Sequence, residues 1–190
     1  MNKKIFGLFK EHFNFNGTKR SEHMSVIRYC LGIISPYNYA FTGSIVWSTL
    51  LGAYWFDQDI DLFVEGSYLR MHELRRGGNL SYKGTFYEVI VLPGVPATFY
   101  GDCLRIRDIP NWNRIADIVW CKDNSIKSTL DQFDITGCSC YFDDKVLFIP
   151  NPSDTLFKRS FVKKQPGISD EIFQSRSSKY RERGITLLYQ

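Results

Sequence analysis

The chain has 190 residues, of which 44% are hydrophobic and 16% aromatic. This composition supplies one domain with a core to bury and argues against an intrinsically disordered protein. The net charge of +4 is uneven, because residues 1–20 carry +4, residues 158–183 carry +5 and the remainder carries −5. An acidic centre between basic ends argues against a plain nucleic-acid-binding domain, whose centre would be basic.

Targeting and redox signals are sparse. No apolar run approaches the roughly 20 residues that a membrane span requires. The first ten residues form a stretch too short and too charged for a signal peptide. The five cysteines are odd in number and lack metal-ligand spacing, so we expect reduced thiols. A cytoplasmic protein without a membrane partner is the resulting expectation.

The first half of the chain alternates helical and strand-like patterns. Residues 21–35 place apolar side chains on one helical face, and Pro36 ends that pattern. A strand over 39–42 then runs into Gly43. The remaining patterns predict a helix over 45–54, a strand over 59–64 and a helix over 67–76.

The second half begins with predicted strands over 85–92 and 114–121 and a helix over 125–132. The run 133–142 predicts a strand, with Cys138 and Cys140 on one face, that continues through a turn into 146–149 as a β-hairpin. A loop-rich, basic stretch follows. The last helix is predicted over about 170–183, with Ser169 as its N-cap and Gly184 as its stop.

This order of elements predicts one α+β domain over residues 1–190. We expect a small mixed β-sheet with flanking helices and a C-terminal helix. A basic segment, 1–20, opens the domain, and a basic region, 151–190, closes it.

The segment 41–64 carries the most informative pattern. A strand ends at Gly43, a helix begins at Ser44, and the next strand carries Asp59 and Asp61 between apolar residues. Alternation puts both aspartates on one face of the strand, about 6–7 Å apart. There they could hold Mg²⁺ for in-line phosphoryl transfer. The Gly43–Ser44 turn offers N–H groups and a hydroxyl to a triphosphate, although such a turn also serves as a simple helix cap.

This combination resembles the Gly-Ser and Asp-x-Asp core of the polymerase-β-like nucleotidyltransferase superfamily. The resemblance implies a small mixed sheet and three carboxylates around two metal ions, with the third carboxylate on a later strand between apolar residues. Asp134, in the run Phe133-Asp134-Ile135, fits that place best, and Glu88 is the alternative.

A second similarity covers the C-terminal part. The run FDITGCSCYFDDKVLF and the last helix resemble small nucleotidyltransferase-like proteins, several of them encoded by phages and large viruses. In that helix Arg176, Lys179, Tyr180 and Arg183 fall on one stripe. The stripe predicts phosphate contacts by three cations and base stacking by the ring. The alternative is a solvated basic face with Tyr180 as a core anchor.

Together these patterns predict a nucleotidyltransferase that moves a nucleoside monophosphate from a triphosphate to an acceptor hydroxyl. Asp59, Asp61 and Asp134 would bind Mg²⁺ or Mn²⁺, and Asp134 would help to deprotonate the hydroxyl. Gly43, Ser44 and the C-terminal stripe would bind the nucleotide. The basic ends favour RNA, such as a tRNA end, as the acceptor, while a protein side chain or a small molecule remains open. The alternative class is a catalytically inactive protein of this fold that acts as a binding or regulatory module.

Overall fold

The structure is a computed structural model that describes residues 11, 38–53, 55, 59–65, 78–82, 85–92, 100–109, 114–121, 125–143 and 145–190. The helices predicted over 21–35 and 67–76, and all of the basic segment 1–20 except Glu11, lie outside these residues. No helix within the described ranges is long and apolar enough to cross a membrane.

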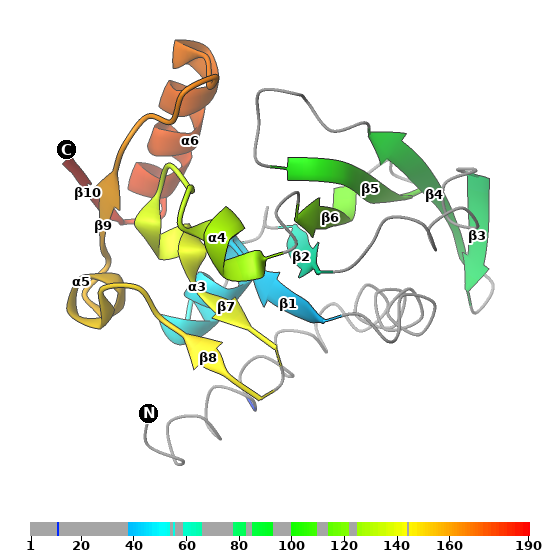
Figure 1. The fold of residues 1–190 in the computed structure, drawn as a ribbon, viewed down its shortest axis with the longest axis horizontal. Coiled ribbons are helices and arrows are strands. Elements are labelled where there is room, and N and C mark those ends of the chain that lie inside the picture. Colours follow the sequence, from blue (N-terminus) through cyan, green and yellow to red (C-terminus); the bar gives the residue numbers. More distant parts are fainter. Residues whose placement is uncertain are drawn as a thin grey trace.

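Eight strands of the described residues form one mixed sheet in the order β3-β4-β5-β6-β2-β1-β7-β8 (Figure 1). Their bounds are β1 Tyr39–Thr42, β2 Ile60–Val64, β3 Gly78–Tyr82, β4 Thr85–Leu92, β5 Tyr100–Asp108, β6 Arg114–Cys121, β7 Tyr141–Phe142 and β8 Leu147–Phe148. β2 and β6 run parallel, and the other neighbours run antiparallel. The strand with the predicted aspartates therefore lies inside the sheet, between β1 and β6.

Helices cover both faces of the central strands. α3 (Ser44–Leu50) packs Ile45 and Val46 into a buried cluster that also contains Leu62 of β2. α4 (Ile126–Leu130) lies over the other face, where Leu130 shares a cluster with Phe63. Successive residues of β2 thus enter opposite layers, as strand alternation requires.

The C-terminal part forms a second packing unit beside α3 (Figure 1). Its elements are α5 Pro152–Leu156, β9 Arg159–Val162, α6 Asp170–Glu182 and β10 Thr186–Tyr189. β9 and β10 pair in parallel. The fully buried Trp47 of α3 joins this part to the sheet, because its Nε1 donates to the Thr155 carbonyl at 3.2 Å and its ring stacks on Tyr180.

The strand predicted over 133–142 is wrong in its first part. Thr136–Ser139 forms a short 3-10 helix, η3, and only β7 and β8 form the predicted hairpin. Tertiary packing explains the difference: a Cβ on Gly137 would lie 2.4 Å from Cη2 of Trp47, so the chain turns tightly against that ring. Cys138 and Cys140 are both buried, but Cys138 lies within η3 and Cys140 follows its last residue, so they do not share a strand face.

The other predicted elements agree more closely with the structure. The strands over 39–42, 85–92 and 114–121 and the last helix are confirmed, and Ser169 caps α6 by accepting from the Ile172 N–H at 3.3 Å. α3 and α4 are shorter than predicted. The sequence patterns did not predict β3, β5, α5, β9 or β10. The predicted α+β architecture with a mixed sheet and a C-terminal helix is confirmed.

Candidate active site

Polar side chains line up across the middle of the sheet. In the strand register Thr42 of β1 lies opposite Asp61 of β2, Asp61 lies opposite Asp117 of β6, and Asp117 lies opposite Arg105 of β5. The Thr42 hydroxyl lies 2.9 Å from the Cys140 carbonyl and is fully buried. Pairing between strands therefore places two aspartates side by side on adjacent parallel strands.

Three carboxylates share one guanidinium. Nη2 of Arg114 lies 2.7 Å from Oδ2 of Asp59, 3.4 Å from Oδ1 of Asp61 and 2.7 Å from Oδ2 of Asp117. Asp59 and Asp61 thus face the same side, as the sequence predicted, and Asp117 joins them from β6. These three carboxylates and Arg114 form what we call the aspartate cluster.

A β-bulge brings Arg114 to this face. Between β5 and β6, Ile106 pairs with Ala116 but Arg107 pairs with Arg114, so Ile115 is an extra residue. The extra residue reverses the alternation of side chains along β6. The Arg114 side chain consequently lies on the same face of the sheet as the side chain of Asp117, although the two residues are three positions apart in β6.

Asp117 has a second cation of its own. Arg105 donates from Nε to Oδ1 at 3.0 Å and from Nη2 to Oδ2 at 2.9 Å, a two-point contact across the β5–β6 pair. The side chain of Asp117 is only 7% exposed. Such a bidentate pair fixes the carboxylate plane, so Asp117 is the most firmly oriented member of the cluster.

Asp61 lies directly against the turn between β1 and α3. Gly43 has a φ of 71°, and a Cβ on it would lie 2.6 Å from Oδ2 of Asp61. Glycine is therefore required here both by its backbone conformation and by the close approach of the carboxylate. Burial and the neighbouring Asp59 carboxylate raise the pKa of Asp61 to about 8, against the opposing charges of Arg114 and Lys179.

The predicted nucleotide turn is built differently from a free anion site. The Gly43 N–H donates to the Cys138 carbonyl at 3.1 Å, and Ser44 is only 5% exposed. Gly43 therefore fixes the distance between α3 and Asp61, and its own N–H is already used within the fold.

The residues of the cluster fit a divalent cation in their chemistry. No three His, Cys, Asp or Glu side chains among the described residues converge closely enough to hold a metal ion as they stand. Carboxylate oxygens are nevertheless the ligands that Mg²⁺ and Mn²⁺ prefer. Asp59 and Asp61 already share a positive group, Nη2 of Arg114, as they would share a cation.

Asp134, the third carboxylate expected from the sequence, lies in another contact. Its side chain is 8% exposed and its Oδ2 accepts from Nη1 of Arg176 at 2.9 Å. Its carbonyl also accepts from the Lys163 N–H at 3.0 Å. The structure thus brings Asp117 to Asp59 and Asp61, and it brings Asp134 to the C-terminal helix.

Glu88, the alternative third carboxylate, lies on β4, three strand positions from β2 in the sheet. At about 4.8 Å per strand, its backbone stands about 14 Å from that of β2. In register it pairs with Arg107 of β5. Glu88 therefore belongs to a part of the sheet away from the aspartate cluster.

The C-terminal stripe divides into two kinds of residue. Tyr180 is 8% exposed, stacks on Trp47 with ring centroids 5.5 Å apart, and accepts a hydrogen bond from the Cys138 thiol. Arg183 lies over the Trp55 ring at 4.6 Å. Tyr180 is thus the core anchor of the two alternatives, and its predicted stacking on a base is not supported by this packing.

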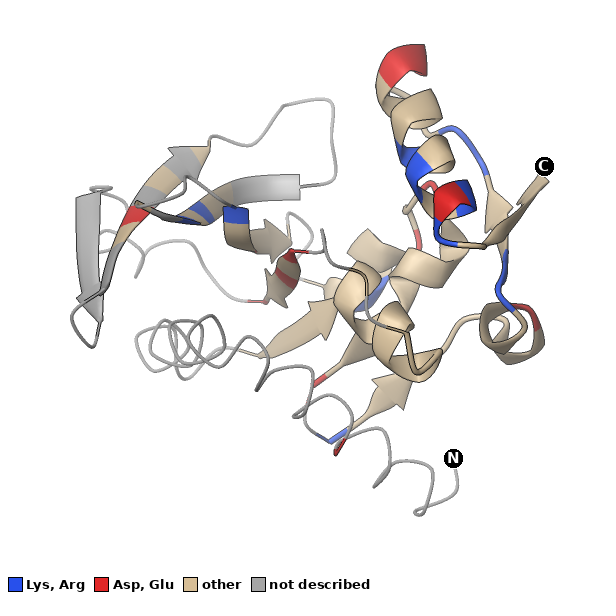
Figure 2. Ribbon diagram, turned by 180° about the vertical axis from the view of Figure 1, so that it is seen from behind, with Lys and Arg blue, Asp and Glu red and all other residues tan. Residues whose placement is uncertain are grey.

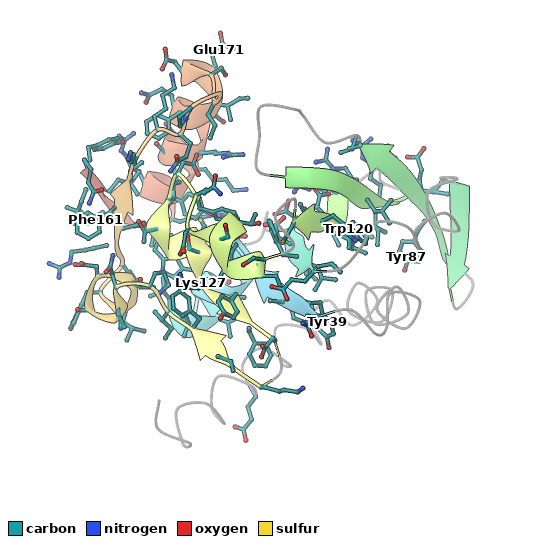
Figure 3. All side chains as sticks on the ribbon, viewed as in Figure 1. Tyr39, Tyr87, Trp120, Lys127, Phe161 and Glu171 are labelled. Carbon is teal, nitrogen blue, oxygen red and sulfur yellow. The ribbon has the colours of Figure 1, made fainter. Side chains whose placement is uncertain are left out.

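Arg176 and Lys179 differ from those two residues. Arg176 is 43% exposed and forms an ion pair with Asp134. The positive charge of Lys179 lowers the pKa of Asp61, against the larger effects of burial and Asp59. Figure 3 shows side chains with nitrogen at their ends reaching from α6 toward β6 and β2, whereas Glu171 marks the far end of the helix. Basic positions on α6 and acidic positions on β2 stand out in Figure 2. Lys179 therefore connects α6 electrostatically to the aspartate cluster, and Arg176 connects it to Asp134.

Three charged residues of the site were missing from the sequence prediction. Asp117 had a readable signal, because the run Ile115-Ala116-Asp117-Ile118-Val119 gives it the same apolar flanks that favour Asp134. Arg105 and Arg114 had none, because their roles depend on the β5–β6 register and its bulge.

Comparison with solved structures places this architecture. The CCA-adding enzyme of Thermotoga maritima, solved in complex with tRNA, aligns with 99% of this chain at a TM-score of 0.51 and 17% identity. The fold is that of a nucleotidyltransferase module. A CCA-adding enzyme solved with ATP aligns with 99% of this chain at a TM-score of 0.47 and 18% identity. No protein-family model and no curated protein sequence matches the chain.

The chain spans about 40% of the length of these two CCA-adding enzymes. At this identity the likeness establishes the fold alone. The side chains of the aspartate cluster and of α6 are the features of this chain that bear on an activity.

Proposed function

We propose that this protein is a nucleotidyltransferase that transfers a nucleoside monophosphate from a nucleoside triphosphate to an acceptor hydroxyl. The acceptor oxygen attacks the α-phosphorus, the bond to the β-phosphate bridging oxygen breaks, and pyrophosphate leaves. The hydroxyl proton passes to a carboxylate. This reaction needs oriented acidic groups, a cation and a phosphate-binding surface.

The observation that carries the proposal is that Asp59, Asp61 and Asp117 all contact Nη2 of Arg114, with Asp61 lying against the Gly43 turn. The three come from two parallel strands in a module whose fold is that of nucleotidyltransferases. A purely structural salt-bridge cluster would require neither a third acid on one arginine nor a glycine held against a carboxylate.

Each acidic residue has a distinct role in this proposal. Asp59 and Asp61 would hold Mg²⁺ or Mn²⁺, which when bound would neutralise the phosphate charge that develops during transfer. Asp117 replaces Asp134 as the third carboxylate, and Arg105 keeps it oriented to accept the proton of the attacking hydroxyl. Asp134 instead positions Arg176.

The triphosphate would lie between the aspartate cluster and α6. Lys179 and Arg176 supply positive charge on the α6 side, and Gly43 lies against Asp61 on the side of the cluster. Asp134 accepts from Nη1 of Arg176, and this contact orients the guanidinium. Arg183 has a different position, over the rings of Trp55 and Tyr180.

RNA is the acceptor that we propose. The region 158–183 carries a charge of +5, which suits a polyanion. The Thermotoga maritima enzyme that shares the fold was solved in complex with tRNA. Because this chain covers about 40% of that enzyme, RNA is tested as the acceptor directly.

The test is an incorporation assay. The protein is incubated with each labelled NTP, Mg²⁺ or Mn²⁺, and total RNA, with Asp61→Asn and the surface variant Lys127→Gln alongside. We expect labelled RNA with the wild type and Lys127→Gln, and a loss of at least a hundredfold with Asp61→Asn. Circular dichroism should show an intact Asp61→Asn fold. Label that appears equally with Asp61→Asn, or with no protein at all, would refute the proposal.

A further inference from the structure

Arg114 has an unusual position for a surface arginine. One of its nitrogens, Nη2, is the common partner of all three acids in the aspartate cluster, at 2.7, 3.4 and 2.7 Å. Its side chain is nevertheless 39% exposed. A side chain with that exposure is in contact with solvent while its guanidinium pairs with the aspartates.

The cluster depends on Arg114 unevenly. Asp117 keeps the two-point contact with Arg105 if Arg114 leaves. Among the ion pairs of the described residues, those of Asp59 and Asp61 are both with Arg114. Removing Arg114 would thus leave two neighbouring carboxylates in need of positive charge, and these are the two that we assign to the metal.

The position of Arg114 is built into the strand. The extra residue Ile115 is what turns the Arg114 side chain to the face of Asp117, and Ile115 itself is 2% exposed in the core. A β-bulge beside the site re-aims a chosen side chain. The backbone geometry of the bulge therefore positions Arg114 beside the aspartates, in addition to the electrostatic attraction between them.

We propose that Arg114 is an internal counter-ion that occupies the cation position of the aspartate cluster and is displaced when a divalent metal binds to Asp59 and Asp61. This inference rests on the metal role assigned under the proposed function. The two cations exclude each other, because both would take the same carboxylate oxygens. Arg114 thereby holds the site together without metal and weakens the affinity for metal alone.

The test measures metal binding without nucleotide or turnover. Mn²⁺ is titrated by calorimetry into the wild type, Arg114→Gln, Arg114→Lys and Arg107→Gln. Arg107 is the matched control, because it stands opposite Arg114 in the β5–β6 pair and its loss removes the same charge from the same sheet. We expect Arg114→Gln to bind Mn²⁺ about tenfold more tightly than the wild type, which corresponds to about 1.4 kcal/mol.

Arg114→Lys should lie between the wild type and Arg114→Gln, because lysine keeps the charge but loses the planar fork. Arg107→Gln should remain within about twofold of the wild type. An equal or weaker Mn²⁺ affinity in Arg114→Gln, or an equal gain in Arg107→Gln, would overturn the counter-ion role while leaving the proposed activity intact. Absence of Mn²⁺ binding in all four proteins, together with no label in the incorporation assay, would overturn the proposed function as well.

A second measurement does not depend on Arg114→Gln folding. The arginine side-chain Nε–H signals of ¹⁵N-labelled wild type are followed by NMR during a Mg²⁺ titration, with Arg114→Lys used to assign the Arg114 signal. We expect that signal to shift toward the position of a solvated arginine as Mg²⁺ binds, whereas the Arg105 signal stays shifted by its contact with Asp117. An Arg114 signal unmoved at saturating Mg²⁺ would refute the displacement.

Discussion

Asp117 and Asp134 are both buried acids next to an arginine, yet we expect their substitution to change different kinetic constants. Asp117→Asn removes the carboxylate assigned to the chemical step, so we expect kcat to fall by roughly 10²–10⁴ with little change in nucleotide affinity. Asp134→Asn frees Arg176, so we expect a raised KM for the triphosphate and a smaller loss in kcat. Steady-state kinetics of the two variants separates these effects. A larger kcat loss in Asp134→Asn would restore Asp134 as the third carboxylate.

The choice between these acids also shows what a single residue pattern can predict. Asp59 and Asp61 could be assigned from the sequence because alternation within one strand decides their common face. The third acid depends on which later strand pairs with β2. Asp117 and Asp134 both have apolar neighbours, and only the parallel β2–β6 pairing, which is a contact between residues far apart in the chain, distinguishes them.

At the scale of the element, the β1–α3 turn offers a sharp comparison between two glycines. Gly43 has a φ of 71° and carries the close approach to Asp61, whereas Gly52 has a φ of 61° and a Cβ added to it would meet nothing within 4 Å. Gly52→Ala should cost only the strain of a left-handed residue, about 1–2 kcal/mol, and keep activity. Gly43→Ala adds to that strain a push on the Asp61 carboxylate.

We therefore expect Gly43→Ala to lose transfer activity by at least tenfold more than Gly52→Ala at a temperature where both proteins are folded. Thermal unfolding gives the stability of each variant, and the incorporation assay gives its activity. Equal activity of the two variants would mean that the position of Asp61 against the turn is not required for transfer.

The last helix could be predicted from the sequence and η3 could not, because local residues define the helix and a long-range contact defines η3. α6 is defined by local signals, namely the Ser169 cap, acidic residues in its first turn and Gly184 with a φ of 76°. η3 forms because Gly137 must lie against Trp47, 90 positions earlier in the sequence. The alternation of residues within one segment cannot predict a contact between residues so far apart in the sequence.

At the scale of the whole molecule, the uneven charge predicts a salt-dependent affinity for RNA. If α6 meets phosphates, the logarithm of the binding constant should fall linearly with the logarithm of the salt concentration, by about one unit of slope for each phosphate contact. Lys179→Gln should lower that slope by about one unit. Lys127→Gln, on α4 and paired with Asp131 at 2.6 Å, should leave it unchanged. Filter binding across a salt series gives the slopes, and equal slopes in all three proteins would remove α6 from the RNA surface.

In the proposed mechanism Asp59 and Asp61 form the cation site of a nucleotidyltransferase, and its triphosphate lies toward α6. A crystal structure with Mg²⁺ and a non-hydrolysable nucleoside triphosphate would show the positions of both ligands. We predict a Mg²⁺ ion at about 2.0–2.1 Å from oxygens of Asp59, Asp61 and the triphosphate, with Arg114 turned away and Lys179 near the phosphates. A nucleotide bound elsewhere, or a metal ion held by Asp134 while Arg114 stays on the three aspartates, would contradict this mechanism.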